Sequence, residues 1–257
     1  MTEQASRCIL ITGAGSGIGA GIAAELARAG HHVVVTDVAA APTDAVAASI
    51  LASGGSAEAR VLDVTSDASV SACLGAVSRP IEVLINNAGL QHVAALEDFP
   101  MEKWDFLVQV MLVGVARLTR AVLPGMRTRG FGRIVNLGSI HSLVASPYKS
   151  AYVAAKHGLL GLSKVVALET AGTDITINTI CPTYVKTPLV DKQIADQART
   201  RGISEAAVVS EVMLKPMPKG VFIEFDELAG IAAFLMSHAA RNITGHTIDV
   251  DGGWTIQ

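Results

Sequence analysis

A glycine-rich segment near the start of the chain constrains the fold most. It runs from Thr12 to Gly19 and follows Cys8–Ile11, an apolar run typical of a buried strand. It precedes Ala20–Ala29, an alanine-rich run with helical character that ends at Gly30. A strand, a glycine-rich turn and a helix in this order predict a dinucleotide-binding βα unit. An ordinary flexible turn between strand and helix is the alternative.

The glycines give this turn a specific chemistry. Glycine permits a tight turn and lets backbone N–H groups approach a pyrophosphate closely. The helix N-terminus adds a favourable dipole. The residues expected to bind the pyrophosphate are Gly13, Ser16, Gly17, Ile18 and Gly19.

Strand-like and helix-like runs alternate along the rest of the chain. This alternation predicts an α/β fold with a doubly wound parallel sheet and helices on both faces. The expected strands are Cys8–Ile11, His32–Thr36, Ala59–Leu62, Val83–Ile85, Arg133–Leu137, Thr176–Cys181 and Thr247–Val250. The 257 residues suit one domain spanning 1–257. A more polar insertion at about 186–221 is expected to form two short helices and a loop, either as a lid over a site or as a solvated decoration.

Composition narrows the function classes. Half of the residues are apolar and few are aromatic, which suits a parallel sheet covered by helices. The net charge of -3 gives no support for nucleic-acid binding. We expect a cytoplasmic protein without a membrane partner, because no apolar run would span a bilayer and Met1–Arg7 has no signal-peptide core. Cys8, Cys73 and Cys181 show no metal-ligand spacing, so no metal is expected, and Cys8 and Cys181 should be buried free thiols.

A tyrosine and a lysine four residues apart form a candidate proton-transfer device. If the segment from Ser150 is helical, Tyr152 and Lys156 project from one face. A phenol has a pKa of about 10. A nearby ammonium favours the phenolate and lowers that pKa, so the pair could transfer a proton near neutral pH. Ser139 lies upstream. Alone the pair is a weak signal, because this spacing occurs by chance on many helices.

An aspartate follows the second expected strand. Asp37 lies 24 residues after Gly13, where a carboxylate can accept hydrogen bonds from the adenosine ribose 2′-OH. The same charge would repel a 2′-phosphate, and no arginine lies immediately beside Asp37. For a dinucleotide, these features favour a free 2′-OH, as in NAD, over a 2′-phosphate, as in NADP. A strand-end aspartate that caps a turn is the alternative.

Four ordered motifs together resemble the classical short-chain dehydrogenases/reductases over essentially the whole chain from about Arg7. They are Thr12-Gly13-x-x-x-Gly17-x-Gly19, Asn86-Asn87-Ala88-Gly89, Ser139 with Tyr152-x-x-x-Lys156, and Cys181-Pro182 with Thr187 downstream. The resemblance implies a Rossmann-type seven-stranded sheet, a nicotinamide cofactor, usually a homotetramer, and catalysis by Ser139, Tyr152 and Lys156. The further cofactor contacts it implies are Asp63, Val64, Asn87, Ala88, Gly89, Tyr152, Lys156, Pro182, Val185 and Thr187.

A finer match resembles the bacterial D-3-hydroxybutyrate dehydrogenases of that family. It rests on Gln91, His141, Lys149 and Gln193, whose counterparts there hold the substrate carboxylate. An ammonium with neutral or cationic donors suits a small anion. The implied substrate residues are Gln91, Ser139, His141, Lys149, Tyr152 and Gln193.

The implied reaction is reversible hydride transfer between NAD and a short 3-hydroxy acid, with 3-hydroxybutyrate and acetoacetate as the expected pair. One alternative is a dehydrogenase of the same fold that acts on a sugar, a steroid or another hydroxy acid. The other is a non-catalytic nucleotide-binding member.

Three positions depart from the family pattern. Met111, in a helix expected over Trp104–Met126, stands where the family usually has the asparagine whose carbonyl holds a water of the proton relay. Thr183 stands in place of a glycine, and Lys186 in place of a residue that is commonly apolar. Met111 puts the relay water in question, and the other two leave the exact substrate open.

Overall fold

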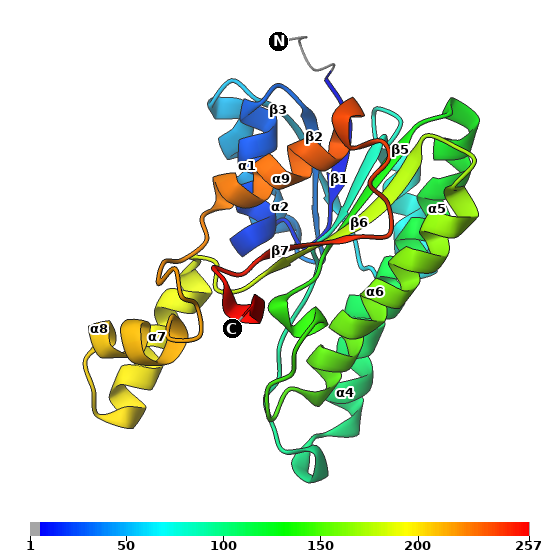
Figure 1. Cartoon of the computed structure of the whole chain (residues 1–257). Coiled ribbons are helices and arrows are strands. Elements are labelled where there is room, and N and C mark those ends of the chain that lie inside the picture. The colour runs from blue at the N-terminus through cyan, green and yellow to red at the C-terminus, as the bar shows by residue number, and fades with distance from the viewer. Residues whose placement is uncertain (1–5, 257) are drawn as a thin grey trace.

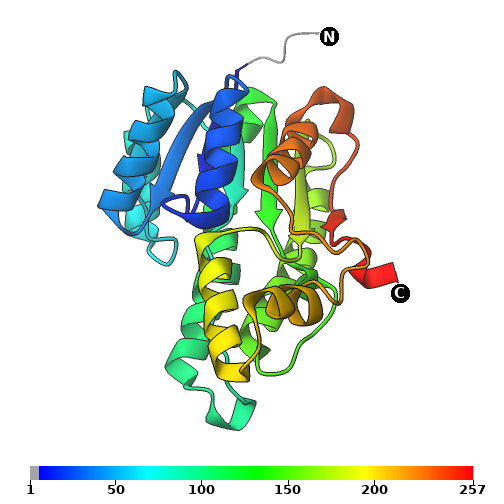
Figure 2. The same ribbon diagram turned by 90° about the vertical axis from the view of Figure 1, so that its left-hand side faces the viewer.

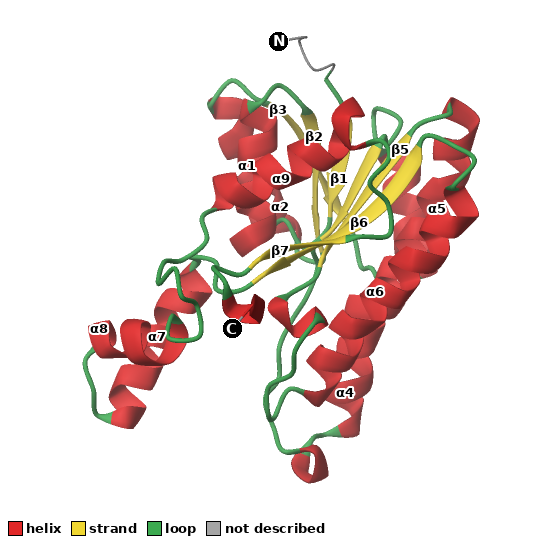
Figure 3. Cartoon of the chain, in the orientation of Figure 1, coloured by secondary structure: helices red, strands yellow, loops and turns green. Residues whose placement is uncertain are grey.

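Seven parallel strands form the centre of the fold in the computed structural model, which describes residues 6–256 except for the side chains of residues 188 and 189 (Figures 1 and 3). The sheet order is β3-β2-β1-β4-β5-β6-β7, so the winding direction reverses between β1 and β4. This confirms the predicted doubly wound sheet. The strands are β1 (Cys8–Ile11), β2 (His32–Asp37), β3 (Ser56–Val61), β4 (Val83–Asn86), β5 (Gly132–Leu137), β6 (Ile175–Pro182) and β7 (Thr247–Val250).

Helices cover both faces of the sheet (Figure 1). One face carries α1 (Gly17–Arg28), α2 (Ala40–Ala52) and α9 (Phe225–Met236), which pack against alternate strand residues such as Ile9 and Ile11. The other face carries α3 (Asp67–Ala76), α4 (Met101–Val108), α5 (Gly114–Arg129) and α6 (Ser150–Thr170), with Leu10 in their core. Because both faces are covered, every residue of β1, β4 and β5 is buried.

The helix expected over Trp104–Met126 is longer and is interrupted. It starts at Met101, ends at Arg129, and passes through a π-helix at Gln109–Val113 between α4 and α5. By length and composition alone the run is apolar enough to cross a membrane, with a mean hydropathy of 1.7. That is weak evidence for a span, because a helix of a soluble core passes the same test and 44% of this window is buried against the rest of the fold.

The third strand and the insertion differ in detail from the prediction. β3 spans Ser56–Val61 rather than Ala59–Leu62, because this edge strand is built from small and charged residues and so lacks an apolar signal. The insertion leaves the sheet after β6 and returns at α9. It contains α7 (Pro188–Arg201), α8 (Glu205–Val208) and a π-helix at Val209–Met213. Figure 2 shows it beyond one end of the sheet.

Short 3-10 helices complete the described part of the chain. They lie at Leu96–Asp98, Ile140–Ser142, His238–Ala240 and Trp254–Ile256. The cysteines Cys8, Cys73 and Cys181 are buried and free, as expected for the two in strands. Within residues 6–256, no group of three or more histidine, cysteine, aspartate or glutamate side chains is placed to hold a metal ion.

Candidate active site

The carboxyl ends of the central strands carry most of the predicted site residues. The glycine-rich turn follows β1, Asp37 ends β2, Asn87 follows β4, and Ser139 follows β5. In an open parallel sheet, ligands bind in the crevice outside these strand ends, next to the point where the strand order reverses. Here that point lies between β1 and β4.

Hydrogen bonds from the Asn87 segment fix the glycine-rich turn. The Asn87 side-chain Nδ2 donates to the carbonyls of Thr12 and Gly13 at 2.8 and 3.0 Å. The backbone N–H groups of Asn87 and Ala88 both donate to Thr12 Oγ1, at 3.0 and 2.9 Å. Thr12 therefore joins the two motifs. It was missing from the predicted site, although its place before Gly13 could have signalled this role.

The turn fits a dinucleotide. Gly13 has a φ of 62°, and a Cβ there would lie 2.8 Å from the Ala88 Cα, so only glycine lets the two segments approach. Gly17 has a φ of 55° and faces open space, with no atom within 4 Å of an added Cβ. Ser16, the exposed N-cap of α1, makes no side-chain capping bond. The first N–H groups of α1 therefore remain available to a phosphate.

Asp37 lies beside this turn. Its Oδ2 accepts from Gly15 N at 3.2 Å, and its Oδ1 accepts from Val38 N at 2.7 Å. The carboxylate therefore caps a turn, as the alternative interpretation held. Since an ionised carboxylate has about four lone-pair sites, it can still accept from a ribose hydroxyl.

Asp63 and Val64 continue this edge after β3. Asp63 Oδ1 accepts from the backbone and the hydroxyl of Thr65, at 2.8 and 2.7 Å. Val64 is buried, and its carbonyl accepts from Arg117 at 2.8 Å. Both residues are ordered by local bonds, and their contact with an adenine ring stays a prediction.

Ser139, Tyr152 and Lys156 converge at the end of β5. Ser139 is the N-cap of the helix Ile140–Ser142, where its Oγ accepts from His141 N at 3.2 Å. Tyr152 and Lys156 lie one turn apart on α6, and the Lys156 Nζ is 5.7 Å from the centroid of the Tyr152 ring. A hydrogen bond between Tyr152 and the Ser139 side chain links the groups.

The pKa values of this group differ from the sequence expectation. Burial raises the pKa of Tyr152, and the bond with Ser139 opposes that rise. Lys156, which was expected to lower it, instead donates to the Leu137 carbonyl at 2.5 Å. Burial lowers the pKa of Lys156 to about 8. The lysine therefore lies close to a neutral–charged balance at physiological pH, which suits a proton relay.

His141 and Lys149 form the second half of the site. The His141 Nε2 lies 3.2 Å from Lys149 Nζ and 3.3 Å from Ser146 Oγ. An ammonium can only donate, so Nε2 accepts and the neutral ring carries its proton on Nδ1. Burial and the charge of Lys149 lower the pKa of His141 to about 4, while burial also lowers that of Lys149. The His141 ring meets the Tyr152 ring edge-on at 6.2 Å.

Gln91 and Gln193 do not contact the His141–Lys149 pair through any hydrogen bond in the described part of the chain. Both are exposed, Gln91 in the loop after β4 and Gln193 on α7. Their contact with a carboxylate stays a prediction that requires the insertion to approach the sheet.

Two aromatic residues missed in the sequence complete the surroundings of His141. Trp254 meets the His141 ring edge-on at 6.4 Å and stacks with Tyr184 at 6.4 Å. The two lie seventy residues apart in the chain, so no local spacing pairs them. They provide an apolar wall beside the polar pair.

The start of the insertion is held by local bonds. Pro182 ends β6, and Val185 pairs with Ile223 in an isolated parallel bridge. Thr187 is the N-cap of α7, where its hydroxyl accepts from Val190 N at 3.2 Å. Thr183 Oγ1 lies 3.2 Å from Met217 Sδ, and Lys186 pairs with Asp191 at 2.7 Å. The contacts of Thr183 and Lys186 are therefore with residues of the insertion.

Met111 is fully buried within the π-helix. It belongs to the core on the α5–α6 face, and its Sδ lies 3.6 Å from the position of a Cβ added to Gly89. A methionine commonly fills an irregular gap of this kind. Met111 is therefore a core-packing residue in this structure.

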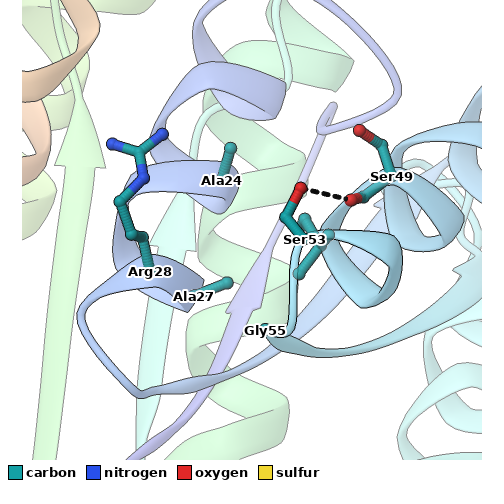
Figure 4. Close-up of a pocket in the computed structure, with 7 residues that line it drawn as sticks. Ala24, Ala27, Arg28, Ser49, Ser53 and Gly55 are labelled. Atoms are coloured by element: carbon teal, nitrogen blue, oxygen red, sulfur yellow. Dashed lines mark hydrogen bonds between the residues drawn. The ribbon is translucent and has the colours of Figure 1, made fainter.

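A small cavity lies elsewhere, between α1 and α2 (Figure 4). Its lining includes Arg28, Ser49 and Ser53, and the Ser53 hydroxyl donates to the Ser49 carbonyl at 2.9 Å. None of the predicted site residues lines it, so it plays no part in the site described above.

Comparison with known proteins agrees with this geometry. A sequence model of the family described as short chain dehydrogenase matches residues 7–198. The chain belongs to the short-chain dehydrogenase family. It is an oxidoreductase, and a nicotinamide nucleotide cofactor is supported.

The matches with named relatives cover nearly the whole chain. A D-beta-hydroxybutyrate dehydrogenase of Rhizobium meliloti is 45% identical, with 98% of this chain and 100% of the relative covered. A D-beta-hydroxybutyrate dehydrogenase of Cupriavidus necator is also 45% identical, with 96% of this chain and 97% of the relative covered. A solved structure of a gluconate 5-dehydrogenase from Burkholderia cenocepacia in complex with NADP and tartrate is 33% identical, with a TM-score of 0.88. The match covers 99% of this chain and 98% of that protein's chain.

Proposed function

We propose that this enzyme oxidises a short 3-hydroxy acid reversibly to its 3-keto acid, with 3-hydroxybutyrate and acetoacetate as the expected pair. The observation that carries the proposal is the Lys149–His141 pair, which lies beside the ring of Tyr152. In a 3-hydroxy acid, two carbon–carbon bonds separate the carbinol carbon from the carboxylate. A cationic group next to the acid–base matches that short separation. The two relatives named as D-beta-hydroxybutyrate dehydrogenases support the same substrate.

Each residue has a role in the proposed reaction. Tyr152 takes the hydroxyl proton once its own phenol is ionised, a step that the burial of the free site opposes, and Lys156 passes the proton on. Ser139 donates a hydrogen bond to the oxygen on which charge develops. Lys149, held by His141, attracts the carboxylate, with Gln91 and Gln193 as further donors, and the wall of Tyr184 and Trp254 faces the apolar end. Bound NAD supplies the acceptor for the hydride that leaves the carbinol carbon.

The proposal also covers the cofactor, the cellular location and the assembly of the enzyme. Asp37 supports NAD, because its charge opposes a 2′-phosphate, although the solved gluconate 5-dehydrogenase holds NADP. Free buried cysteines fit a cytoplasmic location. Exposed apolar side chains on α6, Val165 and Leu168, support assembly into a homotetramer.

The test compares a hydroxy acid with its methyl ester. We expect NADH production from the acid, and a much lower kcat/KM for the ester. Lys149→Ala removes a charge-assisted contact, so kcat/KM for the acid should fall by roughly tenfold to a few hundredfold, while the ester is unaffected. Lys192→Ala, an exposed lysine on α7, is the matched control. An ester turned over as well as the acid by the wild type would move the proposal to an uncharged alcohol.

A further inference from the structure

Tyr148 has a backbone conformation that its residue type disfavours. Its φ is 68°, and no other non-glycine residue in the described range 6–256 has a positive φ. The left-handed region is a genuine outlier for a bulky side chain. Tyr148 follows Pro147 in a turn, and a proline followed by a positive φ is the pattern of a type II turn, whose third position usually takes glycine or asparagine.

The side chain of Tyr148 does not explain this conformation. It is 61% exposed, and within the described residues it makes no hydrogen bond and no ring contact. A residue kept in a disfavoured region without a side-chain contact indicates that the backbone path itself is used.

The turn brings two polar side chains to one atom. Ser146 and Lys149 flank Pro147 and Tyr148, and their side chains both reach His141 Nε2, at 3.3 and 3.2 Å. A negative φ at position 148 would send the chain out of the turn in another direction. Lys149 could then no longer meet the same nitrogen as Ser146.

Bonds on both sides hold the turn. The Tyr148 carbonyl accepts from Ala94 N at 3.0 Å, which ties the turn to the loop that carries Gln91. On the other side, the Lys149 carbonyl accepts from Val153 N at 2.9 Å, so α6 fixes the chain as soon as it leaves the turn. The two substrate-binding loops are therefore joined through the backbone of Tyr148.

We propose that Tyr148 is a positioning residue whose left-handed backbone, rather than its side chain, holds Lys149 against His141. The φ at position 148 thereby sets the preference of the site for a carboxylate. The inference rests on the proposed function, because it takes Lys149 as the group that attracts the substrate carboxylate.

The test changes the backbone preference and the side chain separately. The readout is the ratio of kcat/KM for the hydroxy acid to that for its methyl ester, with NADH affinity and circular dichroism as measures of folding. Tyr148→Gly removes the ring and favours the turn, while Tyr148→Ala removes the ring at a backbone cost similar to that of tyrosine, so in both the ratio should stay within about twofold of the wild type. Tyr148→Ile disfavours a positive φ most strongly, so the ratio should fall about tenfold or more through KM for the acid. Ala94→Pro removes the N–H that donates to the Tyr148 carbonyl and should also lower the ratio. It replaces Tyr148→Ile as the test if the isoleucine variant does not fold.

The outcomes separate the inference from the proposed function. If Tyr148→Gly loses as much as Tyr148→Ile, the side chain matters and the inference is overturned. If Lys149→Ala collapses the ratio while Tyr148→Ile keeps it, the inference alone fails. If Lys149→Ala leaves the ratio unchanged, the carboxylate contact in the proposed function is wrong.

Discussion

Tyr152 is the side chain on which the proposed reaction depends most directly. Tyr152→Phe keeps the ring that packs near Lys156 and His141 but removes the acid–base group. Activity should therefore drop by about two to four powers of ten. Binding of NADH, followed by fluorescence titration, should be retained. Near-normal turnover of the Tyr152 variant would reject the assignment.

Asp37 is the residue expected to set the preference for NAD over NADP. Asp37→Ala removes the charge beside Gly15, so the preference for NAD over NADP should narrow. The measurement is the ratio of kcat/KM for the two cofactors. Asp44→Ala, on α2, is a matched loss of charge away from the turn. A wild type that uses both cofactors equally well would contradict the argument.

His141 makes stability depend on pH in a defined window. Its pKa is lowered from 6.5 to about 4, so the unfolded chain binds the proton first as pH falls. Stability should therefore decrease between about pH 6.5 and pH 4, by on the order of 3 kcal/mol from this residue. His141→Gln should flatten that decrease in urea unfolding series, whereas His246→Gln, at an exposed position, should not. Parallel curves for wild type and His141→Gln would show that His141 is not the cause.

Some residues of the site could be predicted and others could not. Ser139, Tyr152 and Lys156 were predicted because their spacing is local and reflects a shared chemistry. Tyr184 and Trp254 were not, because their contact depends on where β6 and the C-terminal helix end in space. The pKa of Tyr152 was predicted in the wrong direction, because the sequence does not reveal that burial of the phenol raises it.

At the scale of elements, Met111 lies in the π-helix Gln109–Val113, which interrupts the expected helix. An i→i+5 segment has no apolar period of its own, so the sequence predicted one continuous helix. The distortion is present here without an asparagine. Met111 fills the core beneath it.

Met111→Asn should therefore reduce stability rather than improve catalysis. Burying an amide in this apolar cluster should lower the free energy of unfolding by roughly 2–4 kcal/mol. We expect kcat to stay within about twofold, since Tyr152 and Lys156 are untouched. Thermal unfolding and the pH profile of kcat provide the measurement, with Met111→Leu as the volume-matched control. A raised kcat or a flatter acid limb would instead show that the relay lacks the asparagine.

At the scale of the whole molecule, the doubly wound seven-stranded sheet could be predicted from alternation and resemblance. The proposed assembly depends instead on exposed side chains of the surface. Val165 and Leu168 are 54% and 80% exposed on α6, three residues apart and so on one face. Leu168→Glu should break the proposed tetramer, which light scattering would report as a fall from four times the 26.6 kDa of one chain. Leu51→Glu, at an exposed position of α2, should leave the mass unchanged. A wild type that is monomeric would reject the proposal.

The insertion has a small core of its own. Val190, Ile194, Val208 and Met213 pack together, and residues at its base, including Tyr184 and Phe222, pack against them. If α7 and α8 move as a unit, this small core would stay packed, while Leu214 and Met217, which belong to the main core, would stay at the base. A motion that exposes little apolar surface carries little heat-capacity change. If opening of the insertion limits turnover, the Eyring plot of kcat should be straight up to the temperature at which the protein unfolds.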